Sequence, residues 1–148
     1  MLAHRGYSDE LSAREFLNPS PEALKKNILP GTAELYERLL KARRDQEAVL
    51  VYGDPDADGV TGTVILLQAL LRMGLRAHYY IPGREREYYG LQARALQSAR
   101  QSGISLVITV DCGVVPPAVA RHVEEFGLEV VLTDHHPPAP ISEFSPLL

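Results

Sequence analysis

Three short stretches of the sequence combine acidic and imidazole side chains at spacings that suit metal chemistry. The stretches are GDPDADG, VDCG and TDHHPP, and the chemical groups they supply, in chain order, are Asp54, Asp56, Asp58, Asp111, Asp134, His135 and His136. Carboxylates on alternate residues repel one another, and no basic residue lies beside them in the sequence to neutralise them. These acids therefore predict a positive charge that is supplied from outside the chain.

Oxygen and nitrogen donors without paired cysteines suit Mn²⁺ or Mg²⁺ better than a structural zinc ion. Acids that converge from several loops can hold two divalent ions about 3.5–4 Å apart, with one carboxylate between them. Such a pair lowers the pKa of a bound water and stabilises both oxygens of an in-line phosphoryl displacement. Taken singly, each Asp after a strand is typical of a turn or a helix cap. Their joint occurrence favours a site for two metal ions, with Mn²⁺ preferred and Mg²⁺ as the alternative.

Strands and helices must alternate to bring these groups together. Apolar runs predict strands over 48–53, 76–81, 105–110 and 128–133, with helices over 60–74, 91–103 and 116–127. This alternation predicts an α/β fold with a parallel sheet and helices on both faces. Each acidic cluster follows the carboxyl end of a predicted strand, the edge where open parallel sheets bind ligands. The clusters should therefore meet in space.

The first 46 residues read differently from the rest. Leu11, Phe16 and Leu17 follow a predicted cap at Ser8 with helical spacing, and Pro21 is placed at the start of a second helix. A third helix is expected in PGTAELYERLLKARR. We therefore predict a small helical segment over 1–46, followed by a catalytic domain over 47–148.

Composition sets broad limits on the protein class. The chain has 148 residues, about one domain, and a single cysteine, Cys112, which excludes an internal disulfide. No run approaches the roughly 18 apolar residues of a membrane span, and the N-terminus lacks the pattern of a secretory signal. We expect a cytoplasmic protein without membrane contact. The net charge of −4 neither supports nor excludes a polyanionic substrate, because metal-binding acids contribute to it.

Other enzyme classes share the first motif. The run from Asp56 to Val60 resembles the nucleophile loop of haloacid-dehalogenase-type phosphatases, and acids at strand ends also occur in phospho-accepting receiver domains. Both families use a lysine further along the sheet, and a Walker-type loop needs a Gly-Lys pair. The absence of any lysine after Lys41 argues against all three.

The three motifs, in this order, resemble those of the DHH superfamily of phosphoesterases. The sequential Asp-His-His of TDHHPP is more specific than any isolated pair of acids. Within the superfamily the chain resembles the RecJ family of single-strand-specific 5′→3′ DNA exonucleases, through HRGYSDELSAREFLNPS near the N-terminus and GREREYYGL in the middle. The resemblance covers nearly the whole chain, but only the front portion of a RecJ protein.

The resemblance implies metal ligands residue by residue. Asp56 and Asp58 would each bind one of two ions, Asp111 would bridge them, and His135 would complete the shell of the second. Many superfamily members have a histidine where this chain has Tyr52, and a phenol is a poor ligand for Mn²⁺ at neutral pH. The resemblance therefore implies a weaker or more water-dependent first ion.

The resemblance also implies roles around the metal ions. His136 would contact the scissile phosphate or stabilise its developing charge, and Asp134 would orient the motif. Asp54 would act from outside the metal shell or bind the water that substrate displaces, and Gly59 would let the next helix start against the site. For the DNA strand, the candidates are Arg84, Arg86, Tyr88 and Tyr89, with a solvated charged loop as the equal alternative.

The resemblance predicts an incomplete DHH domain. Family members need a further Asp well beyond the Asp-His-His motif, and an accessory nucleic-acid-binding domain usually follows. The expected partners are therefore single-stranded DNA and the remainder of a RecJ-like chain, in DNA repair and recombination, with little activity in these residues alone. Two alternatives stay open: a DHH phosphodiesterase for short oligonucleotides or cyclic dinucleotides, and a non-catalytic DHH scaffold.

Overall fold

A computed structural model gives the fold over residues 2–18, 20, 22, 29–83, 90–113 and 115–136, the part of the chain described below. The chain divides into two compact units, Met1–Ala33 and Glu34–Leu148. No helix in the described ranges is long and apolar enough to cross a membrane.

The first unit contains a short 3₁₀ helix, η1 (Ala3–Arg5), and α1 (Glu10–Leu17). The cap predicted at Ser8 is wrong. The Oδ1 atom of Asp9 instead accepts a hydrogen bond from the backbone N–H of Ser12 at 2.9 Å, and this carboxylate satisfies the first free amides of α1. The helix start predicted at Pro21 lies outside the described residues.

The second unit is built on a parallel sheet. Its strands are β1 (Ala48–Tyr52), β2 (Arg76–Tyr80), β3 (Ile104–Thr109) and β4 (Glu129–Val131). Within the described residues they lie in the order β2-β1-β3-β4, and every pairing is parallel. All five residues of β1 are buried, as expected for a central strand covered on both faces.

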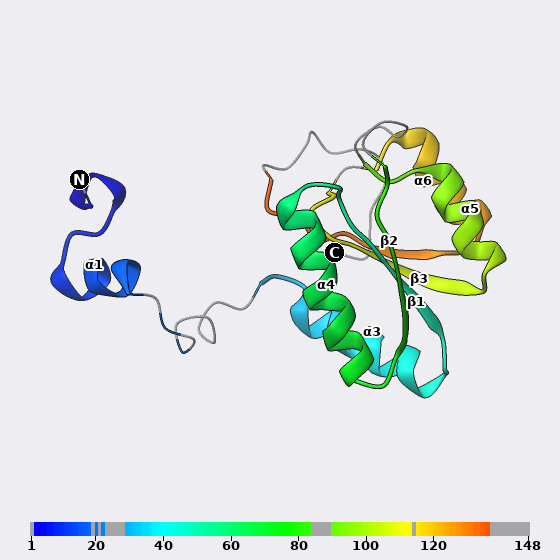
Figure 1. Cartoon of the computed structure of the whole chain (residues 1–148), viewed down its shortest axis with the longest axis horizontal. Coiled ribbons are helices and arrows are strands. Elements are labelled where there is room, and N and C mark those ends of the chain that lie inside the picture. Colours follow the sequence, from blue (N-terminus) through cyan, green and yellow to red (C-terminus); the bar gives the residue numbers. More distant parts are fainter. Residues whose placement is uncertain are drawn as a thin grey trace. The chain divides into compact units, whose positions relative to one another are not determined.

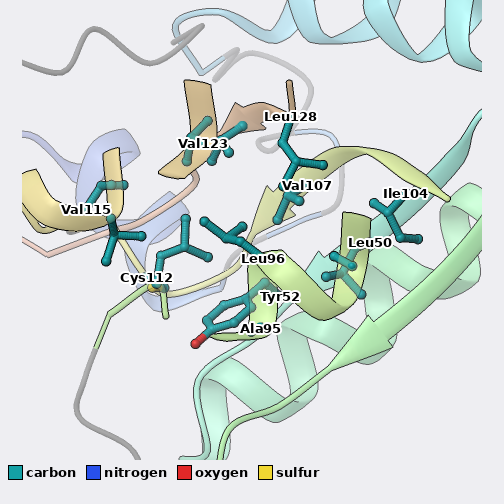
Figure 2. Close-up of a cluster of buried hydrophobic side chains, with 14 of the residues drawn as sticks. Leu50, Tyr52, Ala95, Leu96, Ile104, Val107, Cys112, Val115, Val123 and Leu128 are labelled. Carbon is teal, nitrogen blue, oxygen red and sulfur yellow. The ribbon is translucent and has the colours of Figure 1, made fainter. Parts of the chain in front are cut away.

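Helices cover both faces of this sheet (Figure 1). They are α3 (Thr32–Arg44), α4 (Ala57–Arg72), α5 (Ala93–Gln101) and α6 (Pro117–Glu125). One apolar cluster joins α3 and α4 to side chains such as Val49 and Val51, and the other joins α5 and α6 to the opposite face, around Tyr52 and Val107 (Figure 2). The predicted α/β fold is confirmed. The domain boundary between residues 46 and 47 stays a prediction.

The helices stop where the sequence indicated. Gly74 after α4 and Gly103 after α5 have φ angles of 81° and 78°, a left-handed conformation that glycine adopts at no steric cost. At the start of α6, Pro117 occupies the first turn, where its missing N–H has no helical partner to lose. These ends fix the lengths of the loops that lead into the next strands.

The amino ends of the strands carry a network of paired charges, formed by Arg38, Glu47, Ser105 and Glu129 and called here the amino-edge network. The Nη2 atom of Arg38 donates to Glu47 Oε2 at 2.7 Å, and its Nε atom donates to Glu129 Oε2 at 2.7 Å. The hydroxyl of Ser105 donates to the same Glu47 oxygen at 2.7 Å. Burial alone would raise the pKa of Glu47, but the hydrogen bonds from Arg38 and Ser105 lower it to about 2. The network therefore fastens α3 to the sheet.

Candidate metal centre

The three motifs leave the sheet at its carboxyl edge, and backbone hydrogen bonds continue the strand pairing into their loops. The N–H of Gly53 donates to the carbonyl of Tyr80 at 2.9 Å, and that of Val110 donates to Tyr52 at 2.8 Å. These bonds hold the start of the first two loops to neighbouring strands. The loops therefore begin from fixed positions.

The first loop turns directly into α4, and Asp56 is the cap of that helix. Its Oδ1 accepts from the backbone N–H of Gly59 at 3.0 Å. A Cβ atom on Gly59 would lie 2.5 Å from the backbone oxygen of Asp54, closer than such contacts allow. Glycine is therefore required for α4 to start against the acidic loop, as predicted.

Asp111 lies at the centre of the site and is 6% exposed. Its φ angle of 58° is left-handed, a conformation that Asp and Asn tolerate better than other side chains with a Cβ. Burial raises the pKa of this carboxyl, and the nearby charges of Asp58 and Asp56 raise it further. An ionised carboxylate in this position calls for additional positive charge.

Asp134 joins two of the loops. Its Oδ2 accepts from the backbone N–H of Gly113 at 2.8 Å, and its Oδ1 accepts from the N–H of His135 at 2.8 Å and of His136 at 3.2 Å. Burial alone would raise the pKa of Asp134, but these hydrogen bonds and the His136 ring lower it. These contacts suit the orienting role that the resemblance implies.

A pair of threonines, not singled out from the sequence, fixes the same two loops. The hydroxyl of Thr133 donates to the backbone oxygen of Thr109 at 2.6 Å, and the N–H of Thr133 donates to the Thr109 hydroxyl at 3.2 Å. Thr109 is fully buried. The available signal was a threonine near the end of each of two predicted strands, two residues before Asp111 in one and directly before Asp134 in the other.

The two imidazoles lie against the acids of the other loops. His135 Nε2 is 3.3 Å from Asp58 Oδ2 and 3.2 Å from Asp111 Oδ1. His136 Nδ1 is 2.7 Å from Asp134 Oδ1 and 3.5 Å from Asp111 Oδ1. The hydrogen bond to Asp134, followed by the charge of that carboxylate, raises the pKa of His136 and favours its protonated form.

The donor atoms form two groups, in each of which one ligand atom per residue lies within 4.8 Å of the others. One group consists of Asp54, Asp56 and Asp111, and the other of Asp111, Asp134, His135 and His136. Asp111 belongs to both, and Asp58 adjoins the second through His135. Because the shared carboxylate is buried among other acids and its pKa is raised, the residues present fit divalent cations.

The structure thus brings all seven acidic and imidazole residues of the three motifs to one edge of the sheet. Tyr52 is not among them: its hydroxyl donates to the Gly90 carbonyl at 3.1 Å, within the apolar cluster on the α5 and α6 face (Figure 2). Cys112 belongs to the same cluster and is 1% exposed, a small buried side chain as expected. The four residues predicted to contact DNA, Arg84, Arg86, Tyr88 and Tyr89, lie outside the described residues.

Comparison with known proteins agrees with this geometry. The model of the DHH family, N-terminal domain, matches residues 48–147. The single-stranded-DNA-specific exonuclease RecJ of Bacillus subtilis is 38% identical over 141 residues, which cover 95% of this chain and 18% of that protein. The RecJ exonuclease of Thermus thermophilus is 39% identical over 135 residues, or 91% of this chain and 19% of that protein.

Solved structures give the same result. A crystal structure of exonuclease RecJ bound to manganese matches with a TM-score of 0.71 at 38% identity, over 78% of this chain and 30% of that chain. The chain spans about a fifth of the length of the curated relatives it matches. The resemblance seen in the three motifs is therefore confirmed. The family model covers most of the sequence, and the chain belongs to the DHH family.

Proposed function

We propose that this chain carries the metal-binding part of a phosphodiesterase that degrades single-stranded DNA in the 5′→3′ direction. The observation that carries the proposal is the pair of donor groups that share the buried carboxylate of Asp111. A carboxylate shared by two groups of ligands suits two divalent ions that lie close together. Similarity to the single-stranded-DNA-specific RecJ exonucleases supports single-stranded DNA as the substrate, and the 5′→3′ direction is what the resemblance to the RecJ family implies.

In this proposal Asp56 and Asp58 would each hold one ion, Asp111 would serve both, and His135 would complete the shell of the second ion. Asp54 contributes to the first group from the neighbouring position. Two bound divalent ions, Mn²⁺ in the first instance or Mg²⁺, would supply an activated water and stabilise the oxygens of an in-line displacement at phosphorus. The chain's own part is to hold these carboxylates close together against their repulsion.

Two further residues act on the scissile phosphate and its surroundings. The hydrogen bond to Asp134 favours the protonated form of His136, whose imidazolium would donate a hydrogen bond or a proton to a phosphate oxygen. Asp134 would hold that imidazole in place while also fixing the Gly113 loop. The N-terminus of α4 beside Asp54 adds a partial positive charge that favours phosphate.

We further propose that the working protein includes the remainder of a RecJ-like chain, with another metal-ligating Asp and a domain that binds nucleic acid. The small share of the curated relatives that this chain spans supports that proposal. A place in the cytoplasm and a role in DNA repair and recombination are part of the same proposal.

Calorimetric titration of the chain with Mn²⁺ tests the metal centre. We expect binding, and we expect Asp111→Asn to weaken it about 100-fold or more, because both donor groups lose their shared ligand. The matched control is Asp45→Asn, an exposed acid whose ion pairs are with Lys41 and Arg44. Equal Mn²⁺ affinity in the two variants would contradict the proposed centre.

The activity itself is tested in a chimera in which this chain replaces the matching region of the Bacillus subtilis relative. We expect that chimera to release nucleotides from single strands labelled at the 5′ end, but not from blunt duplexes, and the Asp111→Asn chimera to be inactive. The 148 residues alone should release little or none. Efficient release by this chain alone, or activity of the variant chimera, would contradict the proposal.

A further inference from the structure

A groove lies between α5 and β2, away from the acidic loops. It holds a cavity of about 260 Å³ and is called here the α5–β2 groove. The cavity is lined by residues of β1, β2, α5 and the start of β3: Leu50, His78, Tyr79, Tyr80, Ala95, Ser98, Ala99, Ser102 and Ile104. Its floor is apolar, because Leu50 and Ala95 belong to the buried cluster on that face of the sheet. Polar side chains therefore occur only along its two walls.

One wall is a row along β2. Arg76, His78 and Tyr80 are on alternate residues of this strand and so share one face, the face on which His78 and Tyr80 line the cavity. Arg76 and His78 are exposed, whereas the ring of Tyr80 packs partly against the apolar cluster. This wall combines a cation, an imidazole and an aromatic ring.

The other wall is a row along α5. Ser98 and Ser102 line the cavity four residues apart, and Arg94 precedes Ser98 by the same interval, so the three follow one side of the helix. All three are exposed. The cavity lining thus supplies hydroxyl groups beside an apolar floor. Arg94 and Arg76 continue the two rows beyond this lining, and the Nη1 atom of Arg76 donates to the Gln46 carbonyl at 3.3 Å.

The charge around the groove contrasts with the net charge of −4 of the chain. Between Gly59 and Val110 the only acids in the sequence are Glu85 and Glu87, and both lie outside the described residues. The described parts of α5 and β2 therefore carry arginines and a histidine without any carboxylate. Such a surface attracts polyanions rather than cations.

The carboxyl end of β2, at one end of the groove, adjoins the start of the first acidic loop. The carbonyl of Tyr80 accepts the hydrogen bond from Gly53, the residue before Asp54, and its ring lies 5.6 Å from that of Tyr52. From Arg76 to Tyr80 the strand spans roughly 13 Å at the usual rise per residue. A flexible strand of a few nucleotides could therefore lie along the groove and reach the acidic loops.

We propose that the α5–β2 groove binds a short run of single-stranded nucleic acid. Bases stack on the rings of His78 and Tyr80 over the apolar floor, and Arg76 and Arg94 contact phosphates, the combination of stacking and positive charge that single strands require. An acidic peptide would match the charge but would leave the aromatic wall unexplained. The inference rests on the proposed function only in naming the strand as the one that the metal centre would cleave.

Fluorescence anisotropy with a labelled oligothymidylate of about twelve nucleotides tests the groove. EDTA is present, so that neither metal binding nor cleavage contributes. We expect His78→Ala to weaken binding about fivefold or more, because one stacked base is lost. The double variant Arg76→Gln, Arg94→Gln should lower the slope of log affinity against log salt by about 0.7 for each arginine. The single variant Arg94→Gln, at an exposed position, repeats the test if the double variant fails to fold.

The matched control is Arg121→Gln, an exposed arginine on α6, which should bind the oligonucleotide like the wild type. Asp111→Asn should also bind it in EDTA, which separates this proposal from the metal centre. If Mn²⁺ fails to bind to the wild type while the groove variants no longer bind the oligonucleotide, the proposed function is contradicted and the proposed binding at the groove is supported. Three outcomes would contradict the proposed binding at the groove. They are no binding of the oligonucleotide, groove variants that bind it like the wild type, and binding of hexaglutamate in place of the oligonucleotide.

Discussion

At the amino ends of the strands, Arg38 holds the carboxylates of Glu47 and Glu129, whereas at the carboxyl ends the acids face one another and two imidazoles. As a result, Glu47 at one edge and Asp111 at the other have opposite pKa shifts, whereas the pKa of Asp134, which is hydrogen-bonded to His136 and to backbone amides, is lowered like that of Glu47. The pKa of Glu47 falls to about 2, and that of Asp111 rises, through burial and the charges of Asp58 and Asp56. At one edge the chain supplies the counter-charge itself.

This contrast separates acids that stabilise the fold from acids that serve an external ligand. A largely buried carboxylate stabilises the fold when a guanidinium of the same chain is bonded to it. Carboxylates gathered beside one another lower the stability, and their position in a fold is typical of a functional site. Glu47 and Asp111 therefore predict opposite effects for the same kind of substitution.

The largest effect is expected at the amino edge. Glu47→Gln should lower the free energy of unfolding by about 3 kcal/mol, because Arg38, whose side chain is 12% exposed, loses a charged partner. Urea denaturation at neutral pH measures it. Glu37→Gln, at an exposed acid beside Arg38 on α3, should change the stability by less than about 0.5 kcal/mol. A loss below about 1 kcal/mol in Glu47→Gln would show that the network does not hold α3.

The stabilising effect of Glu47 should depend on pH. The folded-state pKa of Glu47, about 2, is below its ordinary value of 4.5, so its contribution is complete above that value and is lost as the pH falls toward 2. We expect the stability difference between wild type and Glu47→Gln to shrink by about 2 kcal/mol over this window. Urea titrations of both proteins at several acidic pH values measure it. A difference independent of pH would contradict the lowered pKa.

The smallest effect has the opposite sign. Asp111→Asn in EDTA should raise the free energy of unfolding by about 1 kcal/mol at neutral pH. The folded-state pKa of Asp111 is raised, so its ionised form lowers stability, and Asn suits the φ angle of 58°. Saturating Mn²⁺ should then stabilise the wild type but not the variant. Thermal denaturation of both proteins with and without Mn²⁺ measures these differences. An Asp111→Asn variant less stable than the wild type in EDTA would contradict the opposite effects predicted for Glu47 and Asp111.

The sheet and its ligand edge could be predicted because their signals are local. Apolar runs, Gly74 and Gly103 as helix stops, and acids directly after strands each depend on a few neighbouring residues. The fold rule that parallel strands end at one edge then placed Asp54 and His135 together without any contact information.

The features that the sequence did not predict depend on contacts between residues far apart in the chain, which no local pattern shows. Arg38 and Glu129 are 91 residues apart, and their ion pair required the packing of α3 on β4. The direction of the Tyr52 side chain, toward Gly90 and into the apolar cluster, follows from which face of β1 each residue occupies. At the start of α1, Ser8 and Asp9 are both good caps, and only the geometry chose Asp9.

The link between His135 and Asp58 closes a loop of 77 residues. The first acidic loop needs only the packing of β1 with α4, whereas the imidazoles also need β4 to pair with β3. An ion held by both would find no complete site until folding is nearly finished. Its effect should therefore be on the rate at which the native chain opens, with little change in how fast it folds.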